Sequence, residues 1–148
     1  MYLKATAGDR ERDGMVLVRL MNEITETVNK AKEIEMLADL AASVESAAAR
    51  MGETAMSLCQ MLKAPHFKVS FVYALPFLEV MGDVLMAWML LWRATIAAPK
   101  QNTSPFYDGQ IRTAAYFINA VLPITMGRID AIQKGDASVL EMDEKAFG

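Results

Sequence analysis

Residues 71–98 form an apolar stretch that restricts the fold of this chain more than any other segment. Glu79, Asp83 and Arg93 are its only charged residues, and the stretch 84–92 has none. A helix that is apolar on nearly all sides is buried by several neighbours or spans a membrane. A spanning helix needs about 20 mostly apolar residues, roughly twice the charge-free run, and carboxylates are costly in lipid. We therefore expect a buried helix and no membrane span.

The composition favours an all-helical protein of one domain. The chain has 148 residues, 53% of them hydrophobic, with 12 Met, only 8 Gly and only 5 Pro. Such a composition favours helix, and this length allows one sizeable core. The formal net charge of −3 gives no electrostatic reason to expect nucleic-acid binding. The single cysteine, Cys59, fits a reducing, cytoplasmic location and is expected to be a small buried residue.

Four long helical patterns follow one another, separated by short breaks. Apolar residues recur at steps of three and four in each pattern, and the third pattern is expected to lie at the centre. Four helices of similar length with short connections predict an all-α, up-down-up-down four-helix bundle over residues 9–134, followed by a tail, 135–148. The four patterns cover about residues 9–31, 35–62, 70–98 and 105–134.

Prolines and capping residues mark the expected ends and bends of these helices. Pro65 ends the second helix, because proline disfavours helical geometry in the residue before it. Ser70 is expected to cap the third helix, and Pro76 to bend it near its start. Pro123 should kink the fourth helix. The other signals are Thr103 or Ser104 as N-cap, Pro105 at the first helical position and Gly135 at the C-terminal end.

Two carboxylates in the third helix are the first candidates for a functional site. Glu79 and Asp83 are four residues apart and therefore share one helix face. We interpret them as forming core ion pairs with Arg112 or Arg128 of the fourth helix. A divalent-metal site is the alternative. A di-iron bundle needs Glu-x-x-His motifs, but the only histidine, His66, lies in the loop with Pro65.

A group of methionines and tryptophans in the third helix is the second candidate. Trp88 and Trp92 are four residues apart, with Met86 and Met89 beside them. Most aromatic residues of the chain are expected in the core, yet this group exceeds what one helix seam needs. These four residues are therefore a candidate interface with another domain or subunit. The sequence shows no phosphate-binding loop and no nucleophile motif, so we predict no catalytic, cofactor-binding or metal-binding residue.

Two sequence motifs lie in the second half of the chain. The first is Tyr73-Ala74-x-Pro76-Phe77-Leu78-x-x-x-Gly82, followed by Ala87-Trp88 and Leu91-x-Arg93. The second is Phe106-Tyr107-x-Gly109, followed by Tyr116-Phe117 and Leu122-Pro123. Together they resemble the C-terminal helical domain of a subgroup of acyl-CoA dehydrogenases similar to 3-methylmercaptopropionyl-CoA dehydrogenase. The resemblance covers about residues 9–134 and is strongest over 71–134.

The resemblance implies an accessory, non-catalytic domain of an FAD-dependent enzyme of fatty acid metabolism. FAD and the acyl-CoA would be held by upstream dehydrogenase domains of the same polypeptide, and residues 1–14 would be a remnant of those domains or a linker. This chain would need no cofactor. The expected partners are the upstream domains and further copies of the protein. Two alternatives remain: a free-standing helical module that dimerises through Trp88 and Trp92, and a bundle that binds small apolar ligands between its third and fourth helices.

Overall fold

The computed structural model describes residues 7–63 and 67–147, and all regular secondary structure in these ranges is helical. The all-α prediction is thus confirmed for the described residues. The regular up-down-up-down topology stays a prediction, because the third and fourth expected helices are each divided. The α-helices are α1 (Ala7–Lys32), α2 (Ala38–Met61), α3 (Lys68–Val72), α4 (Ala74–Ala97), α5 (Pro105–Tyr116) and α6 (Leu122–Lys134). The short turns are η1 (Glu35–Leu37), η2 (Ala98–Lys100), the π-helical η3 (Phe117–Val121), η4 (Ser138–Leu140) and η5 (Glu144–Phe147).

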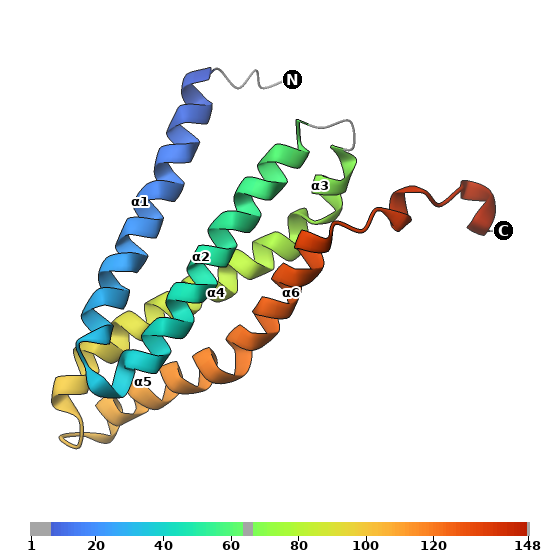
Figure 1. Ribbon diagram of the computed structural model, residues 1–148. Helices are drawn as coiled ribbons and strands as arrows, with labels where there is room; N and C mark the ends of the chain where they lie inside the picture. The colour runs from blue at the N-terminus through green and yellow to red at the C-terminus, as the bar shows by residue number, and fades with distance from the viewer. Residues whose placement is uncertain (1–6, 64–66, 148) are drawn as a thin grey trace.

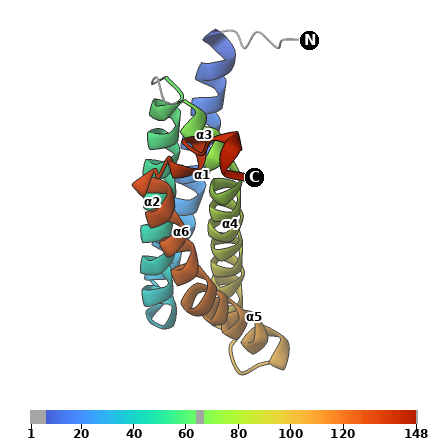
Figure 2. The same cartoon turned by 90° about the vertical axis from the view of Figure 1, so that its right-hand side faces the viewer.

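Helix α4 packs against several other helices, as expected of the apolar stretch. It contacts α1, α2, α5 and α6 (Figure 1). Its buried residues recur at helical spacing and belong to the same core cluster as small and branched residues of α2, such as Val44 and Ala47. Figure 2 shows that α4 also forms one edge of the molecule, with α2 at the opposite edge. The buried residues of α4 are Val80, Val84, Ala87, Leu90, Leu91, Ala94 and Ala97.

The third expected helix is broken near its start rather than bent. Helix α3 ends at Val72, and α4 begins after Tyr73, whose φ of −95° and ψ of 3° depart from helical values. Pro76 causes the break because its ring clashes with the carbonyl four residues earlier and it has no N–H to donate. The capping role expected for Ser70 was wrong. Ser70 is buried within α3, and its hydroxyl donates to the Leu58 carbonyl at 3.3 Å.

The fourth expected helix bends where Pro123 predicted a kink. A π turn, η3, precedes Pro123, and the Leu122 N–H donates to the Phe117 carbonyl five residues back. The wider turn accommodates the interruption of the helical hydrogen bonds at Pro123, which has no N–H to donate. The chain changes direction between α5 and α6 (Figure 1). Both expected ends of this segment are confirmed: Ser104 caps α5, and Gly135 ends α6 in the left-handed conformation with φ 63°.

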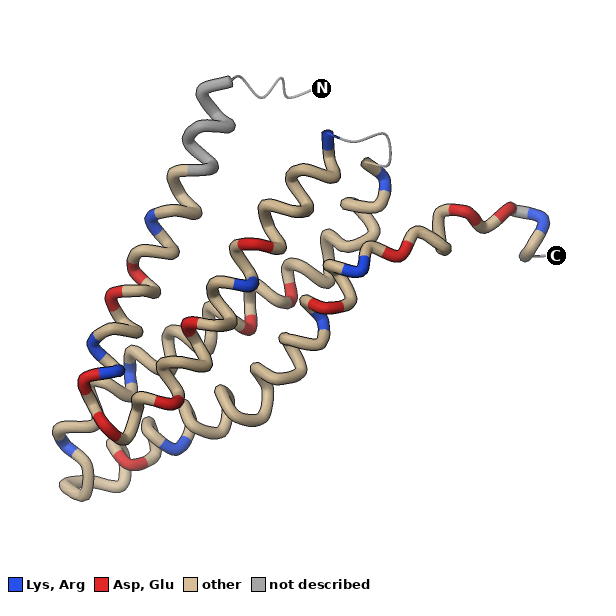
Figure 3. Tube along the Cα trace, viewed as in Figure 1, with Lys and Arg blue, Asp and Glu red and all other residues tan. Residues whose placement is uncertain are grey.

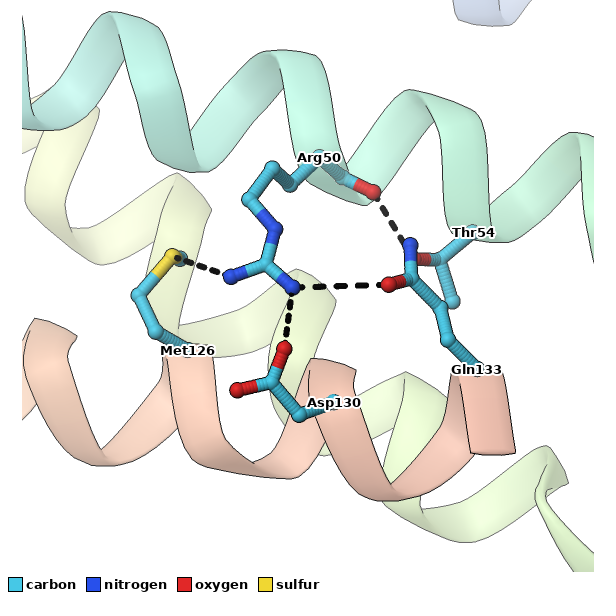
Figure 4. A network of polar contacts seen from close by, with 5 residues as sticks. All are labelled: Arg50, Thr54, Met126, Asp130 and Gln133. Carbon is cyan, nitrogen blue, oxygen red and sulfur yellow. Dashed lines mark hydrogen bonds and ion pairs between the residues drawn. The ribbon is translucent and has the colours of Figure 1, made fainter. Parts of the chain in front are cut away.

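Arg50 of α2 connects this helix to α6 through a polar network (Figure 4). Its guanidinium donates to the Asp130 carboxylate, and at 3.4 Å to the side-chain oxygen Oε1 of Gln133. Gln133 in turn donates to the Thr54 hydroxyl at 3.1 Å. Thr54 is fully buried, so its hydroxyl needs these partners. The network therefore fixes how α6 lies along α2.

The burial expected for Cys59 was wrong, because its side chain is exposed. Its neighbour Leu58 is the residue of this turn that faces the core. Successive helix positions are rotated by about 100°, so the next side chain points away from the core.

Candidate functional site

Glu79 and Asp83 of α4 both approach Arg128 of α6. The Asp83 carboxylate accepts hydrogen bonds from Arg128 Nη1 at 2.9 Å and from the hydroxyl of buried Thr125 at 2.7 Å. The Glu79 carboxylate lies 3.7 Å from Arg128 Nε. The arginine is half-exposed, so these ion pairs lie at the rim of the core and hold α4 against α6. Arg112, the other candidate partner, is exposed on α5.

Replacing Arg128 by Ala is expected to lower the free energy of unfolding by up to about 1 kcal/mol. Solvent-exposed ion pairs contribute little, and salt screens them. Urea denaturation at low and high ionic strength measures both effects. Arg112→Ala is the matched control and should leave the stability unchanged. An equal loss in the two variants would contradict the assignment of Arg128 as the partner of both carboxylates.

The structure brings no metal-binding cluster together in the part of the chain that it describes. Over residues 15–63, 67–143 and 145–146, whose side chains the structure describes, no group of three or more His, Cys, Asp or Glu side chains could hold a metal ion. His66 and Pro65, the loop residues considered from the sequence, lie outside the described residues. Lysine, arginine, aspartate and glutamate are interspersed along the helices (Figure 3).

A polar turn after α6 ties the end of that helix to the break between α3 and α4. The Tyr73 hydroxyl donates to the Asp136 carbonyl at 3.0 Å. The Asp136 carboxylate accepts hydrogen bonds from the Ser138 hydroxyl and from the Ser138 backbone N–H. These bonds favour the charged form and lower the pKa of Asp136 below its ordinary value of 3.8.

Ser138→Ala is expected to raise the pKa of Asp136 towards 3.8, because the hydroxyl donor is the largest cause of the lowered value. The lowered pKa means that this turn stabilises the fold above the unfolded-state pKa and loses that contribution as the pH falls through the folded-state value. Carboxyl NMR titration measures the change. Tyr73→Phe is the control, since Tyr73 bonds the carbonyl and not the carboxylate. A shift of equal size in both variants would contradict the stated cause.

The four residues of the candidate interface do not all share one environment. Trp88 is half-buried, and its indole N–H donates to the hydroxyl of buried Thr27 in α1 at 2.8 Å. Met86, Met89 and Trp92 are exposed. Trp88 therefore anchors α1 to α4, whereas the other three present apolar surface to the outside.

The exposed residues belong to a longer row on α4 that the sequence analysis missed. The row follows a seven-residue repeat within the apolar stretch, which we expected to be buried. Most of its members are exposed, and Leu85 is half-buried. We call this row the α4 apolar stripe; it consists of Leu75, Leu78, Gly82, Leu85, Met86, Met89, Trp92 and Ile96.

The same helix meets a coarse criterion for membrane spans. In the part of the chain that the structure describes, the segment Ala74–Lys100 is the one helix long and apolar enough to cross a membrane. Core helices of soluble proteins meet this criterion too, so it is weak support for a span. The absence of a span stays a prediction.

The start of α1 presents a second apolar surface. Met15, Val16 and Val18 are more than half exposed, although they point to different sides of the helix. The first turns of α1 extend past the ends of α2 and α3 (Figures 1 and 2). This part of α1 therefore has apolar side chains that its own bundle does not cover.

Two grooves are relevant to the alternative function, in which the bundle binds a small apolar ligand. The space between α4 and α5 is about 130 Å³, smaller than the roughly 300–1,000 Å³ of typical ligand pockets. An open groove of about 520 Å³ lies between α2 and the π turn. Its lining residues are Ala42, Ser43, Ser46, Ile118, Asn119, Leu122, Pro123 and Met126.

Comparison with known proteins identifies a family and a relative. The model of a family described as acetyl-CoA dehydrogenase C-terminal like matches residues 20–143. The chain is also 25% identical over 145 residues to the broad-specificity linear acyl-CoA dehydrogenase FadE5 of Mycobacterium tuberculosis. That alignment covers 90% of this chain but 24% of the relative. The chain therefore spans about a quarter of that protein's length.

Proposed function

Because the chain belongs to the acetyl-CoA dehydrogenase C-terminal-like family, we propose that it serves as an accessory domain of an FAD-dependent acyl-CoA dehydrogenase. The family description and the relative, which is about four times longer, both support this role. The dehydrogenase domains would supply the flavin and the acyl-CoA site. The helical domain would pack on them and contribute no catalytic group.

The uncovered start of α1 is the observation that carries the proposal. In a C-terminal domain, the preceding dehydrogenase domains join the chain before α1. The first described side chains there, Met15, Val16 and Val18, are apolar and exposed. We assign the contact with the dehydrogenase domains to the start of α1, because its apolar side chains are left exposed by its own bundle.

The groove beside the π turn does not fit FAD. The groove beside the π turn has the volume of a ligand site, but no lysine or arginine lines it to bind a pyrophosphate. FAD would supply the hydride-accepting chemistry when bound to the dehydrogenase domains. Our proposal also includes a cytoplasmic location, the subgroup similar to 3-methylmercaptopropionyl-CoA dehydrogenase, and an up-down-up-down arrangement of the four long helical segments.

The proposal is tested by purifying the chain alone and together with the dehydrogenase domains. Alone, it should show no flavin absorbance and should not reduce a dye when acyl-CoA is added. With the separately expressed dehydrogenase domains it should co-elute in size-exclusion chromatography. Bound flavin, dye reduction by the chain alone, or failure to co-elute would refute the accessory role.

A charge placed at the start of α1 tests whether the helical domain contacts the dehydrogenase domains there. Val16→Glu should weaken binding of the dehydrogenase domains by about tenfold or more, because a carboxylate in an apolar contact is costly. Met56→Glu on α2 is the matched control, because Met56 and Val16 have nearly equal exposed fractions, 63% and 64%. Equal binding by the two variants would exclude the start of α1 as the contact.

A further inference from the structure

We propose that the α4 apolar stripe pairs with the same stripe of a second copy of this chain, with the two α4 helices antiparallel. The two-fold axis would pass near Leu85 and Met86, at the middle of the stripe. In such an isologous contact, each contact between two different residues occurs twice in the dimer. The inference is independent of the proposed function, which places the dehydrogenase domains on α1.

The spacing of the stripe fits a helix–helix seam. Leu75, Gly82, Met89 and Ile96 are seven residues apart, with Leu78, Leu85 and Trp92 between them. This repeat keeps one line of residues facing a partner helix packed at a shallow angle. From Leu75 to Ile96 the stripe is about 30 Å long at the helical rise per residue, and most of its residues are exposed.

The stripe is complementary to itself in the antiparallel direction. Leu75 would meet Ile96 of the partner subunit, and Leu85 would meet Met86 of the partner subunit. Gly82 would meet Met89 of the partner subunit, a small residue against a long one. A Cβ added at Gly82 would find no atom within 4 Å, so a side chain from a second copy has room to insert there.

The charges beside the stripe are complementary in the same arrangement. Glu79 and Arg93 lie at nearly equal distances on either side of the two-fold axis, so Glu79 would approach Arg93 of the partner subunit. Arg93 is exposed. Glu79 lies 3.7 Å from Arg128, which keeps its shorter bond to Asp83 at 2.9 Å. Glu79 therefore turns towards a second cation at little cost. Two such ion pairs would fix the register of the dimer.

A substitution at Gly82 separates association from folding. Gly82→Gln places a long side chain where Met89 of the partner subunit would insert, and glutamine favours helix over glycine. The full chain should be dimeric in sedimentation equilibrium, and this variant should raise the dimer dissociation constant at least about tenfold while circular dichroism stays helical. Gly127→Gln on α6 is the matched control, because a Cβ there also finds no atom within 4 Å. The control should remain dimeric.

Charge reversal tests the antiparallel register. Glu79→Lys and Arg93→Glu should each weaken the dimer, because each places like charges together across the two-fold axis. The double variant, Glu79→Lys with Arg93→Glu, restores opposite charges and should recover the dimer. Recovery of the dimer by the double variant requires that Glu79 of one copy faces Arg93 of the other. Binding to a membrane would not produce such a recovery.

The proposal is overturned by any of three results. The first is a wild-type chain that stays monomeric at all concentrations. The second is equal association by the Gly82→Gln and Gly127→Gln variants, or a double charge variant no better than its single parents. The third is a monomeric chain that binds phosphatidylcholine vesicles and loses that binding in Gly82→Gln, which would assign the stripe to a lipid surface.

Discussion

Replacing Leu91 by Ala is expected to lower the free energy of unfolding by about 3 kcal/mol, within the roughly 2–5 kcal/mol typical of buried leucines. Leu91 has an exposed fraction of 0% and belongs to the helix that contacts α1, α2, α5 and α6. The loss combines the transfer free energy of the removed atoms with the cost of the cavity left among several helices. Urea denaturation followed by circular dichroism measures it.

Leu62→Ala provides the control for this substitution. It makes the same chemical change at an exposed residue after α2, outside the α4 apolar stripe. The expected loss is below about 1 kcal/mol, because exposed positions contribute little to the core. A loss at Leu62 as large as at Leu91 would mean that α4 is not the centre of the folded chain.

The main features of the fold could be predicted from the sequence where a single local cause decides them. The apolar stretch around Leu91 predicted a central helix because only burial against several neighbours satisfies it. The bend before Pro123 follows from the missing N–H of proline. The end of α6 follows from the freedom of Gly135 to adopt a positive φ. Each of these three features follows from the residue types alone, without knowledge of which residues they contact.

Residues whose role depends on tertiary contacts were predicted less well. Ser70 is a good capping residue, but the break set by Pro76 moved the helix start and left it inside α3, bonded to Leu58. Cys59 is a small residue within a helical pattern and was therefore expected to be buried. It lies instead on the outer side of the last turn of α2. Neither outcome follows from the local sequence, because each depends on which side of the helix meets its neighbours.

The candidate site shows the same division between local and tertiary causes. Arg112 and Arg128 are equivalent by residue type, and the tertiary structure determines that Arg128 is the one that reaches Asp83. The seven-residue repeat of the α4 apolar stripe was present in the sequence. It could not be told from a core seam, because a repeat shows that a helix has an apolar side and not which partner covers it.

Replacing Trp88 by Ala is expected to lower the free energy of unfolding by about 2–4 kcal/mol, somewhat less than for a fully buried tryptophan. Trp88 packs against the core and donates its indole N–H to Thr27 at 2.8 Å, so its loss separates α1 from α4. Trp88→Phe keeps most of the packing and should lose about 1 kcal/mol, the value of the hydrogen bond. Urea denaturation at concentrations where the chain is monomeric measures both variants.

Trp92→Ala is the control, and it should affect association rather than the stability of the monomer. Residues four apart on a helix are offset by about 40°, and this offset moves Trp92 from the α1 seam to the surface, where 48% of it is exposed. Its removal should change the monomer's stability by less than about 1 kcal/mol but weaken association through the α4 apolar stripe. If Trp92→Ala destabilised the monomer as much as Trp88→Ala, both tryptophans would belong to the core and the stripe would lose its largest member.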